Sequence, residues 1–137
     1  MTGAVFIDLS KAFDTVDHAR LLSKLSIYGI KDREMSWFSS YLFNRKQYVA
    51  IDGQSSEMQP ISCGVPQGSI LGPLMFILLI NDIESILKLC NIILYADDTV
   101  LFYAGKTSTE IENILGSELE QIARWLNENN LVRNLKK

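Results

Sequence analysis

Two runs of apolar, β-branched and aromatic residues in the last third of the chain flank a pair of adjacent carboxylates. The runs cover residues 92–95 and 100–103, and Asp97 and Asp98 lie between them. Each run has the composition of a β-strand, and the short polar segment between them is typical of a hairpin turn. The sequence therefore predicts a β-hairpin that carries two adjacent acids at its turn.

This acidic pair has two interpretations. In the simpler one it is a solvated turn, because an Asp side chain can bond nearby backbone groups. In the other, adjacent carboxylates between buried strands repel each other and lose hydration, and a bound divalent cation offsets both costs. The pair alone does not decide between them.

A third carboxylate lies inside an apolar run near the start of the chain, residues 4–9. Strand alternation places Asp8 on the face of Ala4 and Phe6, opposite the odd-numbered residues of the run. An acid in a buried strand is rare unless it is paired or binds a metal. If this strand lies beside the hairpin, we expect Asp8 and the Asp97–Asp98 pair to converge. Such a site suits Mg²⁺ that also binds substrate phosphates.

Three segments resemble the palm motifs of reverse transcriptases. They are residues 6–18 (FIDLSKAFDTVDH), residues 64–73 (GVPQGSILGP) and residues 95–98 (YADD). Their residues, order and spacing are similar to those of non-LTR (LINE-like, jockey-type) retrotransposon enzymes, and the resemblance covers nearly the whole chain. It implies an α+β fold, the right-hand polymerase palm, in which helices back an antiparallel sheet with a ferredoxin-like core. The predicted order of strands and helices is consistent with that class.

The resemblance implies an RNA-directed DNA polymerase that acts by two-metal nucleotidyl transfer on an RNA template, a DNA primer and dNTPs. Asp8 and Asp97 would share two Mg²⁺ ions, with Mn²⁺ as the alternative, and Asp98 would be the third carboxylate. Two such ions activate the primer 3′-hydroxyl and stabilise the leaving pyrophosphate. No membrane partner is expected, because the longest apolar run, residues 70–80, is too short to span a bilayer.

The resemblance also assigns substrate contacts. The nucleotide would be bound by Leu9, Lys11, Ala12, Phe13 and Gln67, and the template and primer by Gly64, Pro66, Gly68 and Tyr95. Phe13 stands where the family has its sugar gate, a ring that excludes a ribose 2′-hydroxyl; a core aromatic is the alternative. The tail NLKK resembles a fourth palm motif and makes Lys137 a candidate general acid. His18, the only histidine, is interpreted as structural.

Length and charge limit what the chain does by itself. Its 137 residues predict one domain, a palm over residues 1–137 that lacks most of the fingers and thumb of a parent polyprotein. The net charge of −3 is low for a nucleic-acid enzyme, so we expect basic surface to come from those other segments. Cys63 and Cys90 lack metal-ligand spacing and indicate small core residues in a reducing compartment. We expect an intracellular location, in the nucleus or cytoplasm, within a retrotransposon ribonucleoprotein.

Periodicity and capping signals predict the remaining elements. We expect a helix over residues 18–28 capped by Asp17, a helix capped by Asp32, strands at 47–51 and 58–62 around the Asp52-Gly53 turn, a buried apolar helix over 74–89, and a final helix that begins at a Thr109/Glu112 capping box.

Two other functions remain open. One is a decayed or repurposed palm that acts as a nucleic-acid or protein binding module, and the other is a metal-dependent nucleotidyl enzyme such as a nucleotide cyclase. The intact Asp8, Asp97 and Asp98 argue against decay. Phe13 and the motif at residues 64–73 favour a polymerase that grips a template. The sequence leaves the template preference and the oligomeric state open.

Overall fold

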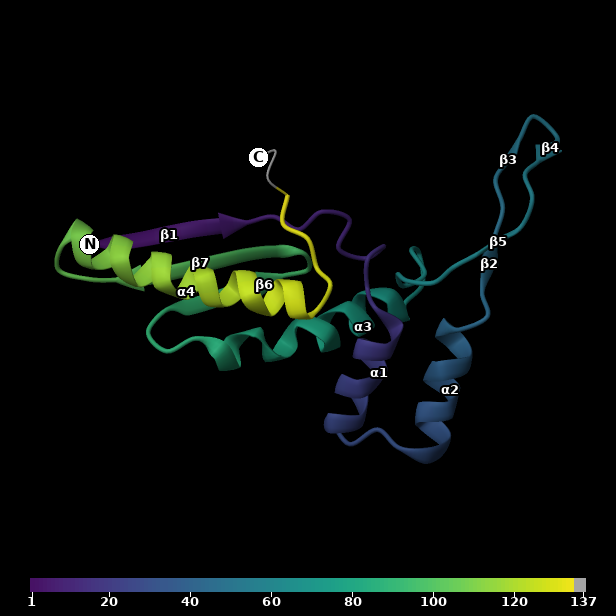
Figure 1. Ribbon diagram of the computed structural model, residues 1–137, viewed down its shortest axis with the longest axis horizontal. Coiled ribbons are helices and arrows are strands. Elements are labelled where there is room, and N and C mark those ends of the chain that lie inside the picture. Colours follow the sequence, from purple (N-terminus) through teal and green to yellow (C-terminus); the bar gives the residue numbers. More distant parts are fainter. Residues whose placement is uncertain (135–137) are drawn as a thin grey trace.

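A computed structural model describes residues 1–134 and has an α+β fold (Figure 1). The elements are β1 (Thr2–Ile7), α1 (His18–Ile27), α2 (Asp32–Leu42), β2 (Lys46–Gln47), β3 (Ala50–Ile51), β4 (Gln54–Ser55), β5 (Gln59–Pro60), α3 (Leu71–Ile80), the 3₁₀ helix η1 (Asn81–Ile86), β6 (Asn91–Tyr95), β7 (Asp98–Ala104) and α4 (Ser108–Glu128).

The largest sheet has three antiparallel strands in the order β1-β7-β6. Its register joins Ile7 to Thr99 and Tyr95 to Asp98. This confirms that the first strand lies beside the acidic hairpin. The alternation is also confirmed, since Ile7 is buried while Phe6 is 80% exposed. Helix α4 runs along one face of the sheet (Figure 1), so the face that carries Phe6 is left open.

Helix α3 is the apolar centre of the fold, as predicted. Met75, Phe76 and Leu79 have no exposed surface. The predicted extent, residues 74–89, is wrong, because the α-helix ends at Ile80 and continues only as η1. Ser85 Oγ donates to the Asp82 carbonyl at 2.6 Å. Such side-chain bonds to the backbone compete with regular α-helical hydrogen bonding.

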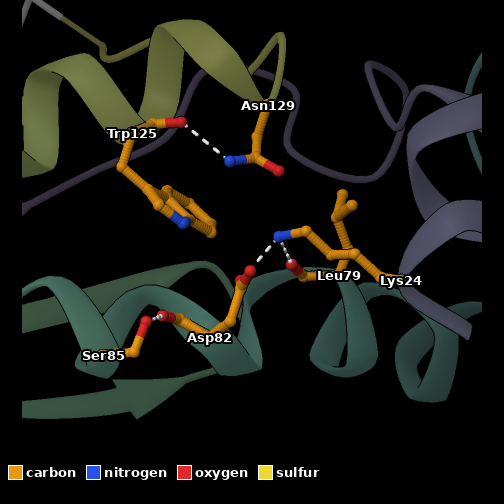
Figure 2. Close-up of polar contacts among 6 residues, drawn as sticks. All are labelled: Lys24, Leu79, Asp82, Ser85, Trp125 and Asn129. Carbon is orange, nitrogen blue, oxygen red and sulfur yellow. Dashed lines mark hydrogen bonds and ion pairs between the residues drawn. The ribbon is translucent and has the colours of Figure 1, made fainter. Parts of the chain in front are cut away.

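One lysine of α1 contacts three other helical elements, α3, η1 and α4 (Figure 2). Lys24 Nζ, from α1, donates to the Leu79 carbonyl at 2.6 Å and pairs with Asp82 of η1. It also lies 4.5 Å from the ring centroid of Trp125 in α4. Burial lowers the pKa of Lys24, and the bond to Asp82 opposes that shift. The charge of Lys24 is therefore compensated where α1, α3, η1 and α4 meet.

The predicted helix caps were partly wrong. Asp17 accepts from the Arg20 amide at 3.0 Å and caps α1 as expected. Asp32 is instead the first residue of α2, with a φ of 48°, and makes no cap bond there. Helix α4 is capped by Thr107, which accepts from the Glu110 amide at 3.2 Å. The error arose because Thr107/Glu110 and Thr109/Glu112 have the same spacing.

Acid should weaken the start of α4. The pKa of Glu110 is lowered, first by the hydrogen bond from the Lys106 amide, which is 2.9 Å long. A carboxyl with a lowered folded pKa stabilises the fold above its ordinary value and loses that contribution as pH falls through the folded pKa. We expect Glu110→Gln to lower the melting temperature at neutral pH and to have a smaller effect at about pH 3. Paired thermal melts would check this, and an equal loss at both pH values would contradict it.

Residues 46–60 form a narrow arm that projects away from the sheet (Figure 1). Its strands pair as β2 with β5 and β3 with β4. The predicted strand 47–51 is interrupted, because Ser56 Oγ accepts from the Val49 amide at 3.0 Å between the two ladders. The expected turn is confirmed: Asp52 and Gly53 have φ values of 48° and 77°, as a tight hairpin requires.

Candidate active site

Two carboxylates face each other at one end of the three-stranded sheet. The β1–β7 register reaches Ile7 and Thr99, and the next residues along these strands are Asp8 and Asp98. Both line one cavity of about 650 Å³. Like charges opposite one another on neighbouring strands are destabilising unless something compensates them. Arg133 lines the same cavity, and a bound cation there would further offset the repulsion between the two carboxylates.

The end of the described chain holds Asp8 in position. Asn134 Nδ2 donates to Asp8 Oδ2 at 2.7 Å, and the Asn134 amide donates to the Asp8 carbonyl at 2.9 Å. A β-bridge joins Leu9 to Arg133 beside these bonds. Sequence reasoning did not connect Asn134 with Asp8. Asn134 belongs to the tail motif NLKK, which could have indicated a role in the site. Its partner Asp8, however, lies 126 residues earlier in the chain.

Asp97 lies in the turn that joins β6 to β7. Because Tyr95 pairs with Asp98, the turn consists of Ala96 and Asp97. Ala96 has a φ of 52°, in the left-handed region. Asp98 is thus a strand residue, whereas the hairpin was expected to carry both acids in its turn. Tyr95, assigned to the template or primer, is 79% exposed beside this turn.

The expected convergence of three carboxylates is not found. Within residues 1–134 there is no group of three His, Cys, Asp or Glu side chains that could hold a metal ion. Asp8 and Asp98 line the same cavity at the end of the sheet, and Asp97 is in the adjoining turn. Carboxylate oxygens are the donors that Mg²⁺ uses when one or two protein ligands are completed by substrate phosphates. The donor set fits that kind of site and does not form an all-protein cage.

The loops of the first and second motifs are bound together through their backbones. The Gly64 amide donates to the Val16 carbonyl, and the Val65 amide donates to the Phe13 carbonyl, both at 2.8 Å. His18 Nε2 donates to the Gly64 carbonyl at 2.7 Å, which confirms its structural role. Gly64 has a φ of 87°, and a Cβ there would lie 2.8 Å from the Asp14 carbonyl oxygen. Only glycine allows this close approach.

The residues assigned to the nucleotide differ in what they present. Leu9 and Ala12 are 7% and 2% exposed, so neither presents its side chain to a ligand. Gln67 Nε2 donates to Asp14 Oδ1 at 2.6 Å. That bond joins the second motif to the first. Sequence reasoning missed it, because it crosses 53 residues.

Phe13 lies between the core and the acidic turn. Its ring packs against Phe76, with centroids 4.7 Å apart. It also lines a cavity of about 370 Å³ together with Tyr95 and Ala96. Phe13 therefore contacts the core on one side and a cavity beside the Asp97 turn on the other.

Four other sequence assignments have mixed outcomes. Lys11 has a φ of 50° and its carbonyl accepts from the Asp14 amide at 2.9 Å, so the first-motif loop is a turn. Cys63 is exposed, and its assignment to the core is wrong. Cys90 is half-buried, and burial raises the pKa of its thiol. The assignment of Lys137 falls outside the described residues.

Comparison with known proteins identifies the family. The profile described as "Reverse transcriptase (RNA-dependent DNA polymerase)" matches residues 1–137. The chain belongs to the reverse transcriptase family. It is 30% identical to the RNA-directed DNA polymerase from the mobile element jockey of Drosophila melanogaster, over 96% of this chain and 15% of that protein. It is 32% identical to a probable RNA-directed DNA polymerase from transposon BS of the same organism, over 89% of this chain and 14% of that one.

A third relative of this reverse transcriptase chain is a retrovirus-related Pol polyprotein from an R2 element of Popillia japonica. It is 28% identical over 71% of this chain and 18% of that protein. The chain thus spans less than a fifth of the length of these relatives. These relatives confirm the similarity to non-LTR retrotransposon enzymes. Among residues 1–134, no helix is long and apolar enough to cross a membrane.

Proposed function

We propose that this chain is the palm of an RNA-directed DNA polymerase and contributes the catalytic carboxylates for RNA-templated DNA synthesis. The observation that carries the proposal is the pairing of β1 with β7, which brings Asp8 of the first motif and Asp98 of the third to the same end of the sheet, where both line one cavity. Helix α4 backs the sheet, and the carboxylates lie at the end of its open face. This arrangement supports the palm assignment and its ferredoxin-like core.

Each motif has a role in the proposed reaction. Asp8 and Asp97 would hold two Mg²⁺ ions, or Mn²⁺ in their place, and Asp98 would add negative charge beside them. The ions would activate the primer 3′-hydroxyl and stabilise the leaving pyrophosphate. Backbone amides of the turn at residues 11–13 would face the triphosphate. Gln67, held by Asp14, would contact the base or template.

The polymerase role can be tested in a chimera. The present chain would replace the matched segment of the jockey enzyme from Drosophila melanogaster, which supplies the rest of that protein. We expect the chimera to extend a DNA primer on an RNA template in Mg²⁺. A folded chimera that binds primer–template but adds no nucleotide would contradict the proposal.

Phe13 should select deoxyribonucleotides. It lines the cavity beside Tyr95 and Ala96, where its ring would meet a ribose 2′-hydroxyl. We expect Phe13→Val in the chimera to improve the use of rNTPs relative to dNTPs by about tenfold or more, a difference of about 1.4 kcal/mol. The measurement is single-nucleotide extension with each nucleotide type. An equal loss for both types would mean that packing against Phe76 is the main role of Phe13.

The 137-residue chain by itself should fold but should not polymerise. Its net charge of −3 repels phosphate backbones, and transfer on this plan depends on positioning and charge stabilisation. We propose that fingers and thumb segments of a longer polyprotein supply the grip on template and primer. Residence in a retrotransposon ribonucleoprotein stays a prediction. Robust templated dNTP incorporation by the purified chain would overturn this expectation.

A further inference from the structure

Two stacked aromatic rings of α2 lie beside a guanidinium from the segment that follows the helix. The rings of Trp37 and Tyr41 lie 5.3 Å apart at an interplanar angle of 15°. The Arg45 guanidinium carbon lies 5.7 Å from the centroid of the Tyr41 ring. Trp37 and Tyr41, four residues apart, lie on one face of α2, whereas Arg45 lies in the segment after the helix ends at Leu42. We call Trp37, Tyr41 and Arg45 the α2 ladder.

The fold does not account for the outer end of this ladder. Helix α2 contacts the hydrophobic core through Met35, Phe38 and Leu42, and Tyr41 packs partly against it. Trp37 is 51% exposed and is not part of that core, although its ring makes an edge-to-face contact with Phe38, with centroids 5.2 Å apart. An exposed tryptophan stacked on a second ring presents a flat aromatic surface to solvent.

The inner end of the ladder reaches a loop already assigned to the active site. Arg45 lines a cavity of about 650 Å³ together with Lys46, Asp14, Gly64 and Gln67. Gly64 and Gln67 belong to the second motif. The ladder therefore forms a continuous path from the exposed ring of Trp37 to the second-motif loop.

We propose that the α2 ladder binds a single strand of nucleic acid by stacking an unpaired base on the exposed side of Trp37, while Tyr41, held between Trp37 and Arg45, supports the stack. Under the proposed function, on which this identification rests, that strand is the template on its way to the active site. Aromatic rings combined with basic groups are the usual means of binding single strands without sequence preference.

Charge favours nucleic acid over a protein segment at this face. Arg45 and Lys46 stand at one end, and Arg33 precedes Trp37 by one helical turn, with its side chain exposed. The nearby acids, Asp32 and Glu34, are both in the first turn of α2. Arg45 and Lys46, at the cavity end, match a phosphate backbone, and the exposed ring of Trp37 matches a base.

Tryptophan fluorescence tests this without any catalysis. Trp37 is exposed and Trp125 is buried, so a bound base should quench Trp37 selectively. The chain would be titrated in EDTA and low salt with an unstructured single-stranded RNA of about 12 nucleotides, within the usual site size. We expect saturable quenching, and weaker binding by the duplex of the same sequence. EDTA excludes polymerisation, so an inactive polymerase and a non-binding ladder give separate results.

Variants identify the residues responsible. By competition against a labelled strand, Trp37→Ala should weaken binding about tenfold, the effect of losing one stacked base. Arg45→Lys should weaken it less, because it keeps the charge and loses the planar group. Tyr28→Ala removes an exposed aromatic at the end of α1 and should leave binding unchanged. Unchanged affinity in Trp37→Ala, with its melting temperature preserved, would overturn the proposal and leave this face to a protein contact. An equal loss in Tyr28→Ala would also overturn it.

Discussion

Asp8→Asn and Asp97→Asn should each lower nucleotide addition by the chimera about a thousandfold, which corresponds to about 4 kcal/mol of transition-state stabilisation. Each change removes a negative charge from the end of the sheet where the proposed Mg²⁺ ions are held. The fold should survive, because Asn keeps an oxygen that can accept the hydrogen bond from Asn134. In metal-free buffer the melting temperature should be unchanged or higher, since like-charge repulsion is reduced. Single-turnover extension rates and thermal melts measure the two effects.

A matched control tests whether the loss of activity comes from the site itself or from the loss of any negative charge. Asp52 is exposed at the tip of the arm and has a φ of 48°, a conformation that Asn adopts readily. Asp52→Asn should therefore leave both the extension rate and the melting temperature unchanged. Near-normal extension by Asp8→Asn or Asp97→Asn would remove those residues from the catalytic site.

Gly64→Ala should destabilise the chain by about 2–4 kcal/mol, measured by urea denaturation. The new methyl group would lie 2.8 Å from the Asp14 carbonyl oxygen, and the φ of 87° is itself unfavourable for alanine. To relieve this close contact, the second-motif loop would have to move away from the first-motif loop. Such a movement would lengthen the bonds from Gly64 to Val16 and from Val65 to Phe13. Residual folded protein should therefore also extend primers poorly in the chimera.

Two other glycines provide the control for backbone conformation alone. Gly53 and Gly68 each have a φ of 77°, and a Cβ at either position would meet no atom within 4 Å. Gly53→Ala and Gly68→Ala should each cost about 1 kcal/mol, the conformational part only. If all three variants lost the same stability, the close contact between the two motif loops would have no energetic importance.

The sequence predicted the parts of the fold that depend on local patterns. Alternation in residues 4–9 identified the buried face of β1, and the apolar run after Pro73 identified α3 as the buried helix. Boundaries were less predictable where two patterns competed. Thr107 and Thr109 offered equivalent caps, and the side chains of Ser56 and Ser85 interrupted elements whose composition alone would continue them.

The sequence predicted which residues belong to the candidate site better than it predicted how they are arranged. The motifs selected Asp8, Asp97 and Asp98, but the register that makes Asp98 a strand residue depends on the left-handed turn at Ala96. Alanine is uncommon in that conformation, so composition did not indicate it. The bonds from Asn134 to Asp8 and from Gln67 to Asp14 join distant segments, and a single sequence carries no pairing information for them.

The proposed metal position can be mapped directly on the 137-residue chain by iron-mediated cleavage. Fe²⁺ would replace Mg²⁺ in the presence of a dNTP, and ascorbate and peroxide would then generate radicals that cut the backbone close to the ion. If the carboxylates at the end of the sheet hold the ion, cuts should cluster next to Asp8 and at the turn of Ala96 and Asp97. They should be lost in Asp8→Asn and retained in Asp52→Asn. Cuts elsewhere in the chain, or an unchanged pattern in Asp8→Asn, would contradict a catalytic metal site at the junction of β1 and β7.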